Sequence, residues 1–224
     1  MKNRIIIYTP PKAGLHMLCD IISLMINPKV NIYNKDNMYE IIPHQTRKSA
    51  INKQKICSTH PYYFSFTHET IKNSKLILIT RHPINLGISR YFYFEKRKKN
   101  PRSLFDYMQM ALPNIIEEYT KYFAFSKNHS QNILLTFEDC VEKKRETIHK
   151  IYDFIKEDLN LSSIDIEKIC ELTNFKKVNE EEKKRGKSKL GKIQPFLFHR
   201  AGDIGGWEKY LTEEQLNVLL KKLY

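Results

Sequence analysis

The sequence has few of the features that would mark a secreted, membrane-spanning or metal-binding protein. Only 4 of its 224 residues are cysteine, and no two are spaced as CxxC, so we expect buried thiols rather than disulfides or a metal site (Cys19, Cys57, Cys140 and Cys170). No apolar run approaches the about 20 residues that cross a bilayer. The segment Met1–Pro11 lacks the long apolar stretch and cleavage site of a signal peptide. We therefore predict a cytoplasmic protein without a bound metal.

Acidic residues are scarce relative to basic ones. Lys and Arg number 38 against 25 Asp and Glu, which leaves a net charge of +13. Hydrophobic residues make up 41% of the chain and aromatic residues 12%, a composition far from that of a disordered basic tail. The length suits one domain over residues 1–224. We expect a folded protein whose ligand or partner carries negative charge.

Most of the net charge lies in two segments. From Arg90 to Arg102 there are six basic residues and one acid, and from Lys183 to Lys192 six basic residues and no acid, so these segments carry +11 of the +13. One interpretation is two solvated surface loops. The other is that one or both border a site for a polyanion, either a nucleotide, a sulfated or phosphorylated acceptor, or nucleic acid. Composition does not choose between them.

Short β-branched runs alternate with helical patterns along the chain. Expected strands are Ile5–Tyr8, Lys55–Ser58, Leu76–Thr80 and Ile133–Thr136, and expected helices cover 15–26, the segment that carries Ser89, 101–128, 142–158, about 164–172, and 212–223. Loops are expected over 183–192 and 200–207. Buried strands that alternate with helices predict an α/β fold, a single domain with a mostly parallel sheet and helices on both faces.

Basic side chains directly follow three of the predicted strands. Lys12, His60 and Arg81 come after the first, second and third strand, and ligands of such sheets bind at these carboxyl ends. A loop that leads into a helix presents N–H groups to a phosphate, and Lys12 adds a charge there. The Walker A spacing is absent, because Lys12 precedes Gly14 and no Ser or Thr follows to hold Mg²⁺. A nucleotide kinase or ATPase is therefore disfavoured.

Each of these residues has a structural and a functional interpretation. Arg81 directly follows a predicted strand, two residues before Pro83, where its guanidinium can bind a phosphate with two hydrogen bonds beside the hydroxyl of Ser89. The alternative is that Arg81 caps a carboxylate such as Glu138 or Asp139. His60 is either an ordinary polar residue at a strand end or a general base that faces the same cleft as Lys12. The loop around Lys12 is either an ordinary turn or a phosphate site.

Taken together, these segments resemble the sulfotransferases that use 3′-phosphoadenosine 5′-phosphosulfate (PAPS). The resemblance covers nearly the whole chain and keeps the order and spacing of six motifs. The matching segments are YTPPKAGLHML for the phosphosulfate loop, CSTHP for the segment with the catalytic His, RHPINLGIS for the 3′-phosphate motif, and then FED at 137–139, TNF at 173–175 and RAGDIGGWEKYLT from Arg200.

The resemblance implies a reaction and a role for each matching residue. A sulfuryl group passes from PAPS to a hydroxyl or an amine, adenosine 3′,5′-bisphosphate (PAP) is released, and no metal is needed. Lys12 would neutralise charge on the bridging oxygen and His60 would take the acceptor's proton. Beside Lys12, the resemblance assigns the 5′-phosphate to the N–H groups of Ala13, Gly14, Leu15 and His16. It assigns the 3′-phosphate to Arg81, Ser89, Arg200, Ala201 and Gly202, and the adenine to Thr173 and Phe175, with Met17 in place of an adenine-stacking Trp.

Other functions stay open at this point. One is a catalytically weak or inactive nucleotide- or polyanion-binding module of the same fold, and another is a nucleic-acid binder that uses the two basic segments, although we expect no specific nucleic acid. The acceptor is expected to be a small molecule or a glycan, and the basic segments predict an anionic one. The segment through which many members of the family dimerise is not retained. The resemblance therefore does not imply a dimer for this chain.

Overall fold

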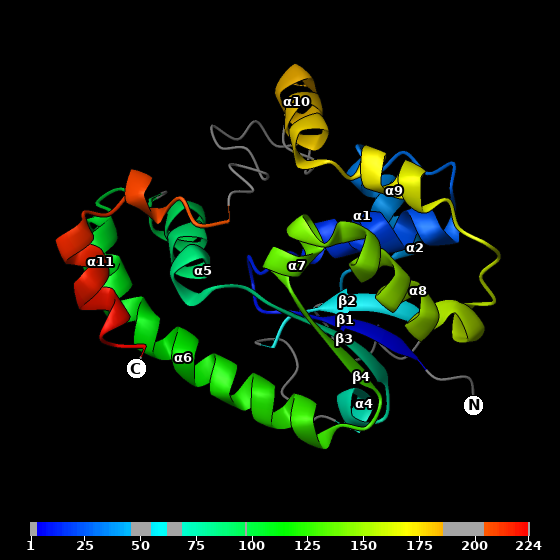
Figure 1. Cartoon of the computed structure of the whole chain (residues 1–224), viewed down its shortest axis with the longest axis horizontal. Helices are drawn as coiled ribbons and strands as arrows, with labels where there is room; N and C mark the ends of the chain where they lie inside the picture. The colour runs from blue at the N-terminus through cyan, green and yellow to red at the C-terminus, as the bar shows by residue number, and fades with distance from the viewer. Residues whose placement is uncertain (1–3, 46–54, 62–68, 97, 186–203, 224) are drawn as a thin grey trace.

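A computed structural model describes residues 4–45, 55–61, 69–96, 98–185 and 204–223 (Figure 1). At its centre lies a four-stranded sheet in the order β2-β1-β3-β4, with every neighbouring pair parallel. The strands are β1 (Ile5–Tyr8), β2 (Ile56–Thr59), β3 (Lys75–Thr80) and β4 (Asn132–Thr136). The predicted α/β fold class is therefore confirmed.

Helices connect the strands and cover the sheet. In chain order they are α1 (Leu15–Ile26), α2 (Lys35–Ile41), α4 (Glu69–Lys72), α5 (Pro83–Arg90), the π-helix η1 (Tyr91–Glu95), α6 (Leu104–Asn128), α7 (Phe137–Glu142), α8 (Lys144–Leu159), α9 (Ile166–Leu172), α10 (Phe175–Arg185), the 3₁₀ helix η2 (Trp207–Lys209) and α11 (Glu213–Leu220).

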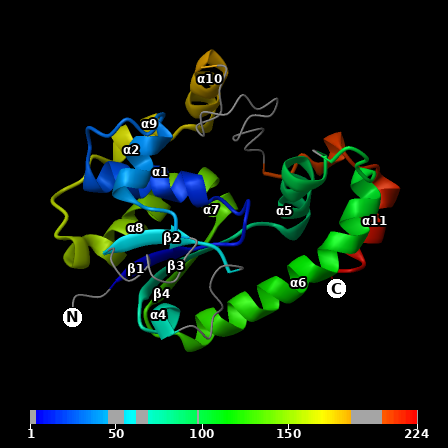
Figure 2. The same cartoon turned by 180° about the vertical axis from the view of Figure 1, so that it is seen from behind.

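The central strand β1 is buried along its whole length because helices lie on both faces of the sheet. α1 and α8 cover one face, and α4 and α6 cover the other (Figures 1 and 2). Ile5 and Ile7 join the core formed with α1 and α8, while Ile6 and Tyr8 pack on the opposite face against Tyr122 of α6. Because the strands are buried on both faces, their sequences are continuous apolar runs rather than alternating ones.

A third apolar cluster holds α5, α6 and α11 together. Ile84 and Ile88 of α5 pack with Met108 and Leu112 of α6, and Leu219 of α11 lies in the same cluster. α11 begins with a capping box, in which the Thr212 hydroxyl accepts the N–H of Gln215 and the Gln215 side chain accepts the N–H of Thr212. The cluster fixes the position of α5, which carries residues of the candidate site.

Several of the predicted boundaries are shifted, and two of the shifts have a clear physical cause. The second strand runs from Ile56 to Thr59 rather than from Lys55, because its register pairs Ile5 with Ile56 and Tyr8 with Thr59. The helix predicted over 142–158 begins at Lys144 as α8. A separate helix, α7, ends at Glu142, and Thr136 caps it by accepting the N–H of Asp139 at 3.0 Å.

The predicted basic loop over 183–192 also needs correction. Residues 183–185 form the last turn of α10, where Lys184 pairs with Glu181, and the rest of that segment lies outside the described residues. Of the predicted buried thiols, three are buried and Cys170 is partly exposed, and none of the four forms a disulfide. Over the ranges described above, no helix is long and apolar enough to cross a membrane.

Gly14 sits where the β1–α1 loop (residues 9–14) approaches the sheet closely. Its φ is +124°, and a Cβ there would lie 3.0 Å from side-chain carbons of both Ile79 and Phe137. We predict that Gly14→Ala lowers the free energy of unfolding by about 2–5 kcal/mol, through backbone strain and overpacking.

Gly205→Ala is the matched control for Gly14→Ala, because Gly205 has a φ of +76° and open space around its Cβ position. It should cost only about 1–2 kcal/mol, from strain alone. Urea unfolding measures both values. Equal losses in the two variants would contradict the close approach at Gly14.

Candidate active site

Three strands end side by side and deliver three basic residues to one edge of the sheet. Tyr8, the last residue of β1, pairs with Thr59, the last residue of β2, and with Leu78 of β3. The segments that follow these strands carry Lys12, His60 and Arg81. The convergence predicted from the sequence is therefore present in the structure.

The carbonyl oxygens of the β1–α1 loop are held by hydrogen bonds, beginning with Thr9 and Pro10. The Nδ1 of His60 lies 2.6 Å from the carbonyl oxygen of Thr9. Because a carbonyl oxygen only accepts, this ring nitrogen carries the hydrogen, and the lone pair of the neutral imidazole is on Nε2. The carbonyl of Pro10 accepts the N–H of Ala13 at 3.2 Å.

Two arginines hold the next two carbonyls of the loop. Arg90, the last residue of α5, donates from Nε to the carbonyl of Pro11 at 3.3 Å, and its Nη2 pairs with Glu118 of α6 at 2.7 Å. Arg81 donates from Nη1 to the carbonyl of Lys12 at 3.4 Å. Four successive carbonyls are thus engaged, three of them by basic side chains.

This arrangement leaves the N-terminus of α1 as the anion-binding part of the loop. Ala13 is buried and its N–H is already engaged with Pro10, so the predicted phosphate donors that remain at the beginning of α1 are the N–H groups of Gly14, Leu15 and His16. The first turn of a helix offers N–H groups without an intrahelical acceptor and the positive end of the helix dipole. These groups suit a phosphate or sulfate.

Arg81 is fixed both at its backbone and at its guanidinium group. The Tyr119 hydroxyl accepts the N–H of Arg81 at 2.9 Å and donates to its carbonyl at 2.6 Å. The guanidinium carbon lies 4.1 Å from the centre of the Phe137 ring, a cation–π contact. Glu138, a candidate partner of Arg81 from the sequence, accepts the backbone N–H of His82 at 3.0 Å.

The ammonium group of Lys12 lies over an aromatic ring. Its Nζ is 4.5 Å from the centre of the Tyr93 ring in η1, and Lys12 itself has a φ of +72°, a left-handed conformation that is strained for a lysine. Strain of this kind collects at functional sites. Tyr93 therefore borders the position at which Lys12 would meet a ligand.

The surroundings of His60 favour its neutral form. Burial lowers its pKa below 6.5, the positive charges of Arg90 and Lys12 lower it further, and only the hydrogen bond to Thr9 acts in the opposite direction. His44 packs edge-on against the His60 ring at 4.9 Å, and its Nδ1 lies 3.1 Å from the Ser58 hydroxyl. At neutral pH His60 is a base with its lone pair on Nε2.

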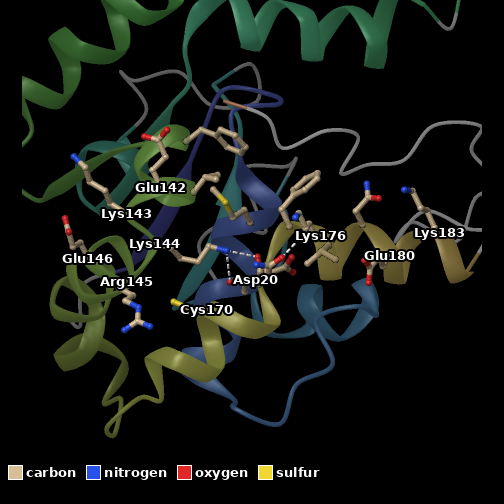
Figure 3. A pocket seen from close by; sticks show the side chains of 18 residues that line it. Asp20, Glu142, Lys143, Lys144, Arg145, Glu146, Cys170, Lys176, Glu180 and Lys183 are labelled. Carbon is tan, nitrogen blue, oxygen red and sulfur yellow. Dashed lines mark hydrogen bonds between the residues drawn. The ribbon is translucent and has the colours of Figure 1, made fainter. Parts of the chain in front are cut away.

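A pocket of about 920 Å³ opens beside this centre (Figure 3). Met17, Thr173 and Phe175, which the sequence analysis assigned to one adenine site, all line it although they come from three elements. Phe137 lines the same pocket and contacts the Arg81 guanidinium, so the pocket and the strand-end site are continuous. Its apolar and aromatic wall suits a flat heterocycle.

Part of the predicted phosphate site is not described. Arg200, Ala201 and Gly202 lie outside the described residues. The segment that follows them reaches the site, since the Trp207 ring packs 4.9 Å from the ring of His82, next to Arg81. Ser89 is partly buried on α5, and its contact with a phosphate stays a prediction.

Several basic residues of the segment 90–102 form ion pairs with acidic residues of the protein itself. Arg90 pairs with Glu118, and the carboxylate of Glu95, which is buried, pairs with Lys98 at 2.5 Å and with Arg102 at 3.6 Å. Lysines 96 and 99 of this segment are exposed. Three of the six basic residues of this segment thus support the fold.

Sequence reasoning missed several residues of this site. Arg90, Tyr93 and Tyr119 contact the loop or Arg81 from α5, η1 and α6, and nothing in their sequence neighbourhood distinguishes them from packing residues. His44 was also missed, because its pairing with Ser58 joins the chain across a gap of 14 residues. Within the described part of the chain, no three His, Cys, Asp or Glu side chains are grouped to hold a metal.

Comparison with known proteins identifies relatives along almost the whole chain. The model of the sulfotransferase domain matches residues 2–222. The chain is 23% identical to the 3-beta-hydroxysteroid sulfotransferase of Cavia porcellus over 92% of its own length and 77% of that protein's. It is 27% identical to cytosolic sulfotransferase 5 of Arabidopsis thaliana, over 72% of this chain and 57% of that one.

Solved structures share the fold at lower identity. Mouse sulfotransferase SULT7A1, crystallised with PAP, superposes with a TM-score of 0.70 at 17% identity and covers all of this chain and 82% of its own. A retinol dehydratase in complex with retinol and PAP gives a TM-score of 0.68 at 17% identity over 98% of this chain and 80% of that one. These similarities establish the same α/β fold.

The environment of His60 predicts its titration. Because burial and two cations disfavour the imidazolium, the pKa of His60 in the folded protein should lie below 6.5. The stability that neutral His60 contributes is present above about pH 6.5 and is lost as the pH falls through the lower folded pKa. An NMR titration of the histidine ring protons, with His60→Gln to assign the signal, measures the midpoint. A midpoint at or above 6.5 would contradict this electrostatic account.

Proposed function

Because this chain belongs to the sulfotransferase domain family, we propose that Lys12 and His60 carry out its transfer of a sulfuryl group from PAPS to an acceptor. The prediction of a PAPS-dependent sulfotransferase from the sequence is confirmed at the level of family and fold. The roles of individual residues are our proposal. The observation that supports them best is the convergence of Lys12, His60 and Arg81 on one loop next to a pocket of about 920 Å³.

The residues present fit PAPS at each of its chemical parts. The N-terminus of α1 and Lys12 offer donors and positive charge for the 5′-phosphosulfate. Arg81, with Ser89 and the segment from Arg200 to Gly202, would bind the 3′-phosphate. The pocket between Met17 and Phe175 would take the adenine. PAPS supplies the sulfuryl group and a stable bisphosphate leaving group.

His60 is proposed to be the general base. Its Nδ1–H is fixed on the carbonyl of Thr9 at 2.6 Å, so Nε2 receives the proton of the acceptor hydroxyl as the new S–O bond forms. Burial lowers the pKa of His60, and the neighbouring cations Arg90 and Lys12 lower it further, so the ring is neutral before this step. The hydrogen bond to Thr9 fixes both the tautomer and the ring orientation.

Lys12 is proposed to stabilise the leaving oxygen. As the bond between sulfur and the bridging oxygen breaks, negative charge grows on that oxygen, and an ammonium group held near it lowers the barrier. The Lys12 carbonyl is engaged by Arg81 and its ammonium group lies over Tyr93, so both ends of the residue are positioned. This electrostatic role needs no metal ion.

Substitution of the two residues tests these roles. We expect His60→Ala to lower kcat by about 10²–10⁴-fold, because a positioned general base contributes that much. Lys12→Ala should lower kcat by about 10²–10³-fold, the effect of removing one donor to a developing charge. Transfer from radiolabelled PAPS to a panel of hydroxylated acceptors measures both.

The controls are His149→Ala and Lys121→Ala, exposed residues of α8 and α6 that should keep full activity. Binding of PAP to His60→Ala should remain near the parent value, because His60 acts on the acceptor. Activity in Lys12→Ala and His60→Ala equal to that of the controls would refute the assigned roles.

We propose that the acceptor is a small hydroxylated molecule that carries negative charge. Two of the relatives are named for small molecules, 3-beta- and 3-alpha-hydroxysteroids. Tyr93 borders the reacting centre, and the exposed lysines 96 and 99 follow it in the chain, so an aromatic wall lies next to positive charge. A cytoplasmic location is part of the proposal, in keeping with the relatives named cytosolic sulfotransferases.

The charge preference is tested with paired acceptors. We expect kcat/KM for an anionic acceptor to exceed that for its neutral analogue, and to fall as NaCl rises from 50 to 300 mM, because salt screens exposed charges. The double variant Lys96→Gln/Lys99→Gln should lose most of this preference, whereas Lys121→Gln/Lys127→Gln on the exposed side of α6 should keep it. Equal turnover of both acceptors without salt dependence would refute the preference.

A further inference from the structure

A second histidine, His44, lies against the ring of the proposed base. The centres of the His44 and His60 rings are 4.9 Å apart and their planes differ by 63°, an edge-to-face arrangement. Such aromatic pairs pack in a preferred geometry, so each ring restricts the orientation of the other. His60 alone accounts for the base of the transfer reaction, which leaves the function of the neighbouring imidazole to be explained.

The segment that carries His44 is hydrogen-bonded to β2. The N–H of Ser58 donates to the carbonyl of Pro43 at 3.0 Å, and the N–H of Gln45 donates to the carbonyl of Ser58 at 2.8 Å, so His44 and Ser58 form a parallel bridge. The hydroxyl of Thr59 donates to the carbonyl of Gln45 at 2.7 Å. The residues on both sides of His44 are therefore attached to the last two residues of β2.

The His44 side chain is fixed as well as its backbone. Its Nδ1 lies 3.1 Å from the hydroxyl oxygen of Ser58, a residue that is 0% exposed. The ring of Tyr39 in α2 stacks on the His44 ring, with 6.4 Å between the ring centres and 30° between the planes. A hydrogen bond to the sheet and an aromatic neighbour together hold the His44 ring in one position.

The hydrogen bond between His60 and Thr9 fixes one atom of the His60 ring, the donor Nδ1. A tilt of the ring about this bond would leave Nδ1 in place and would displace Nε2, the atom that takes the acceptor's proton. Contact with the His44 ring opposes this tilt. The same contact keeps water away from His60 and adds to the burial that lowers its pKa.

We infer that His44 is a positioning residue for the base: its ring, carried on the bridge to β2, holds the His60 imidazole at the angle at which Nε2 meets the acceptor hydroxyl. The inference rests on the proposed function, in which His60 takes the acceptor's proton. His44 acts through His60 and exchanges no proton with the acceptor. A misplacement of 1 Å in an active site can cost about 10²-fold in rate, so control of the ring angle is sufficient to affect transfer.

The groups that face His60 determine how the loss of His44 changes the pKa of the base. Burial is the largest cause of the low pKa; the hydrogen bond to Thr9 raises it, and Arg90 of α5 and Lys12 of the β1–α1 loop lower it. These three groups remain when His44 is removed, whereas part of the burial is lost, so the pKa of His60 rises. A positive charge on His44 at low pH acts in the same direction, since its removal also raises that pKa.

Transfer kinetics over a range of pH test the inference. We expect His44→Ala to lower kcat by about 10- to 100-fold and to move the acid limb of the kcat/KM profile to higher pH. The binding of PAP, measured by titration calorimetry, should stay near the parent value, because the effect passes through His60, which acts on the acceptor.

A conservative variant and a matched control accompany His44→Ala. The double variant His44→Phe/Ser58→Ala keeps an aromatic ring against His60 and leaves no buried hydroxyl without a partner, so it should recover most of the lost activity with a pH midpoint near that of the parent. His149→Ala removes an exposed histidine of α8 and should leave both kcat and the midpoint unchanged.

The outcomes separate this inference from the proposed function. If His60→Ala transfers as fast as the parent, the proposed function fails and the inference fails with it. If His60→Ala is impaired but His44→Ala, shown to be folded by circular dichroism, keeps the kcat and the pH midpoint of the parent, only the positioning role is overturned. A lower kcat with an unmoved midpoint also overturns it, because the loss would then not act through His60.

The parent protein gives an answer that needs no variant to fold. The ring protons of His44 and His60 should show a nuclear Overhauser effect in the NMR spectrum, because the ring centres are only 4.9 Å apart. The absence of this signal between the two assigned rings would overturn the inference and would leave the proposed role of His60 untouched.

Discussion

The hydrogen bonds to four successive carbonyls of the β1–α1 loop are the constraint on which the candidate site depends. His60, Arg90 and Arg81 each hold one carbonyl between Thr9 and Lys12, and they come from the end of β2, from α5 and from the end of β3. The same side chains therefore fix the loop and supply the neutral base and two of the positive charges of the site. This coupling places the proposed base, the proposed phosphate ligand and Lys12 in one rigid unit.

The strand ends and their basic residues could be predicted from the sequence because two-sided burial leaves uninterrupted apolar runs, such as Ile5–Tyr8. The hydrogen bonds that hold the β1–α1 loop could not be predicted. These contacts join residues that are far apart in the sequence. Arg90 donates to the carbonyl of Pro11, 79 positions away, and the Tyr119 hydroxyl accepts the N–H of Arg81, 38 positions away. α10 was missed because its Lys and Glu residues give little apolar periodicity, and the break at Lys143 because Thr136 caps a helix of its own.

The basic residues of the chain fall into two groups, those in ion pairs that stabilise the fold and those near the candidate site. Buried Glu95 gathers Lys98 and Arg102, and Glu118 holds Arg90, so half of one basic segment stabilises the turn after η1. Three other basic side chains are positioned individually by contacts within the protein: Lys12 over Tyr93, Arg81 over Phe137, and Lys144 by its hydrogen bond to Thr173. Phe137 joins these regions, since it contacts Arg81 and lines the pocket that contains Lys144. A nucleotide bound there would touch all three.

Amide hydrogen exchange with and without PAP tests the central claim most directly. The account predicts that PAP, in the absence of Mg²⁺, slows exchange at the beginning of α1 and at the segments around Phe137 and Thr173, because the nucleotide would lie across the loop and the pocket. Unchanged exchange at the beginning of α1 with saturating PAP, together with protection there by ATP and Mg²⁺, would contradict the account.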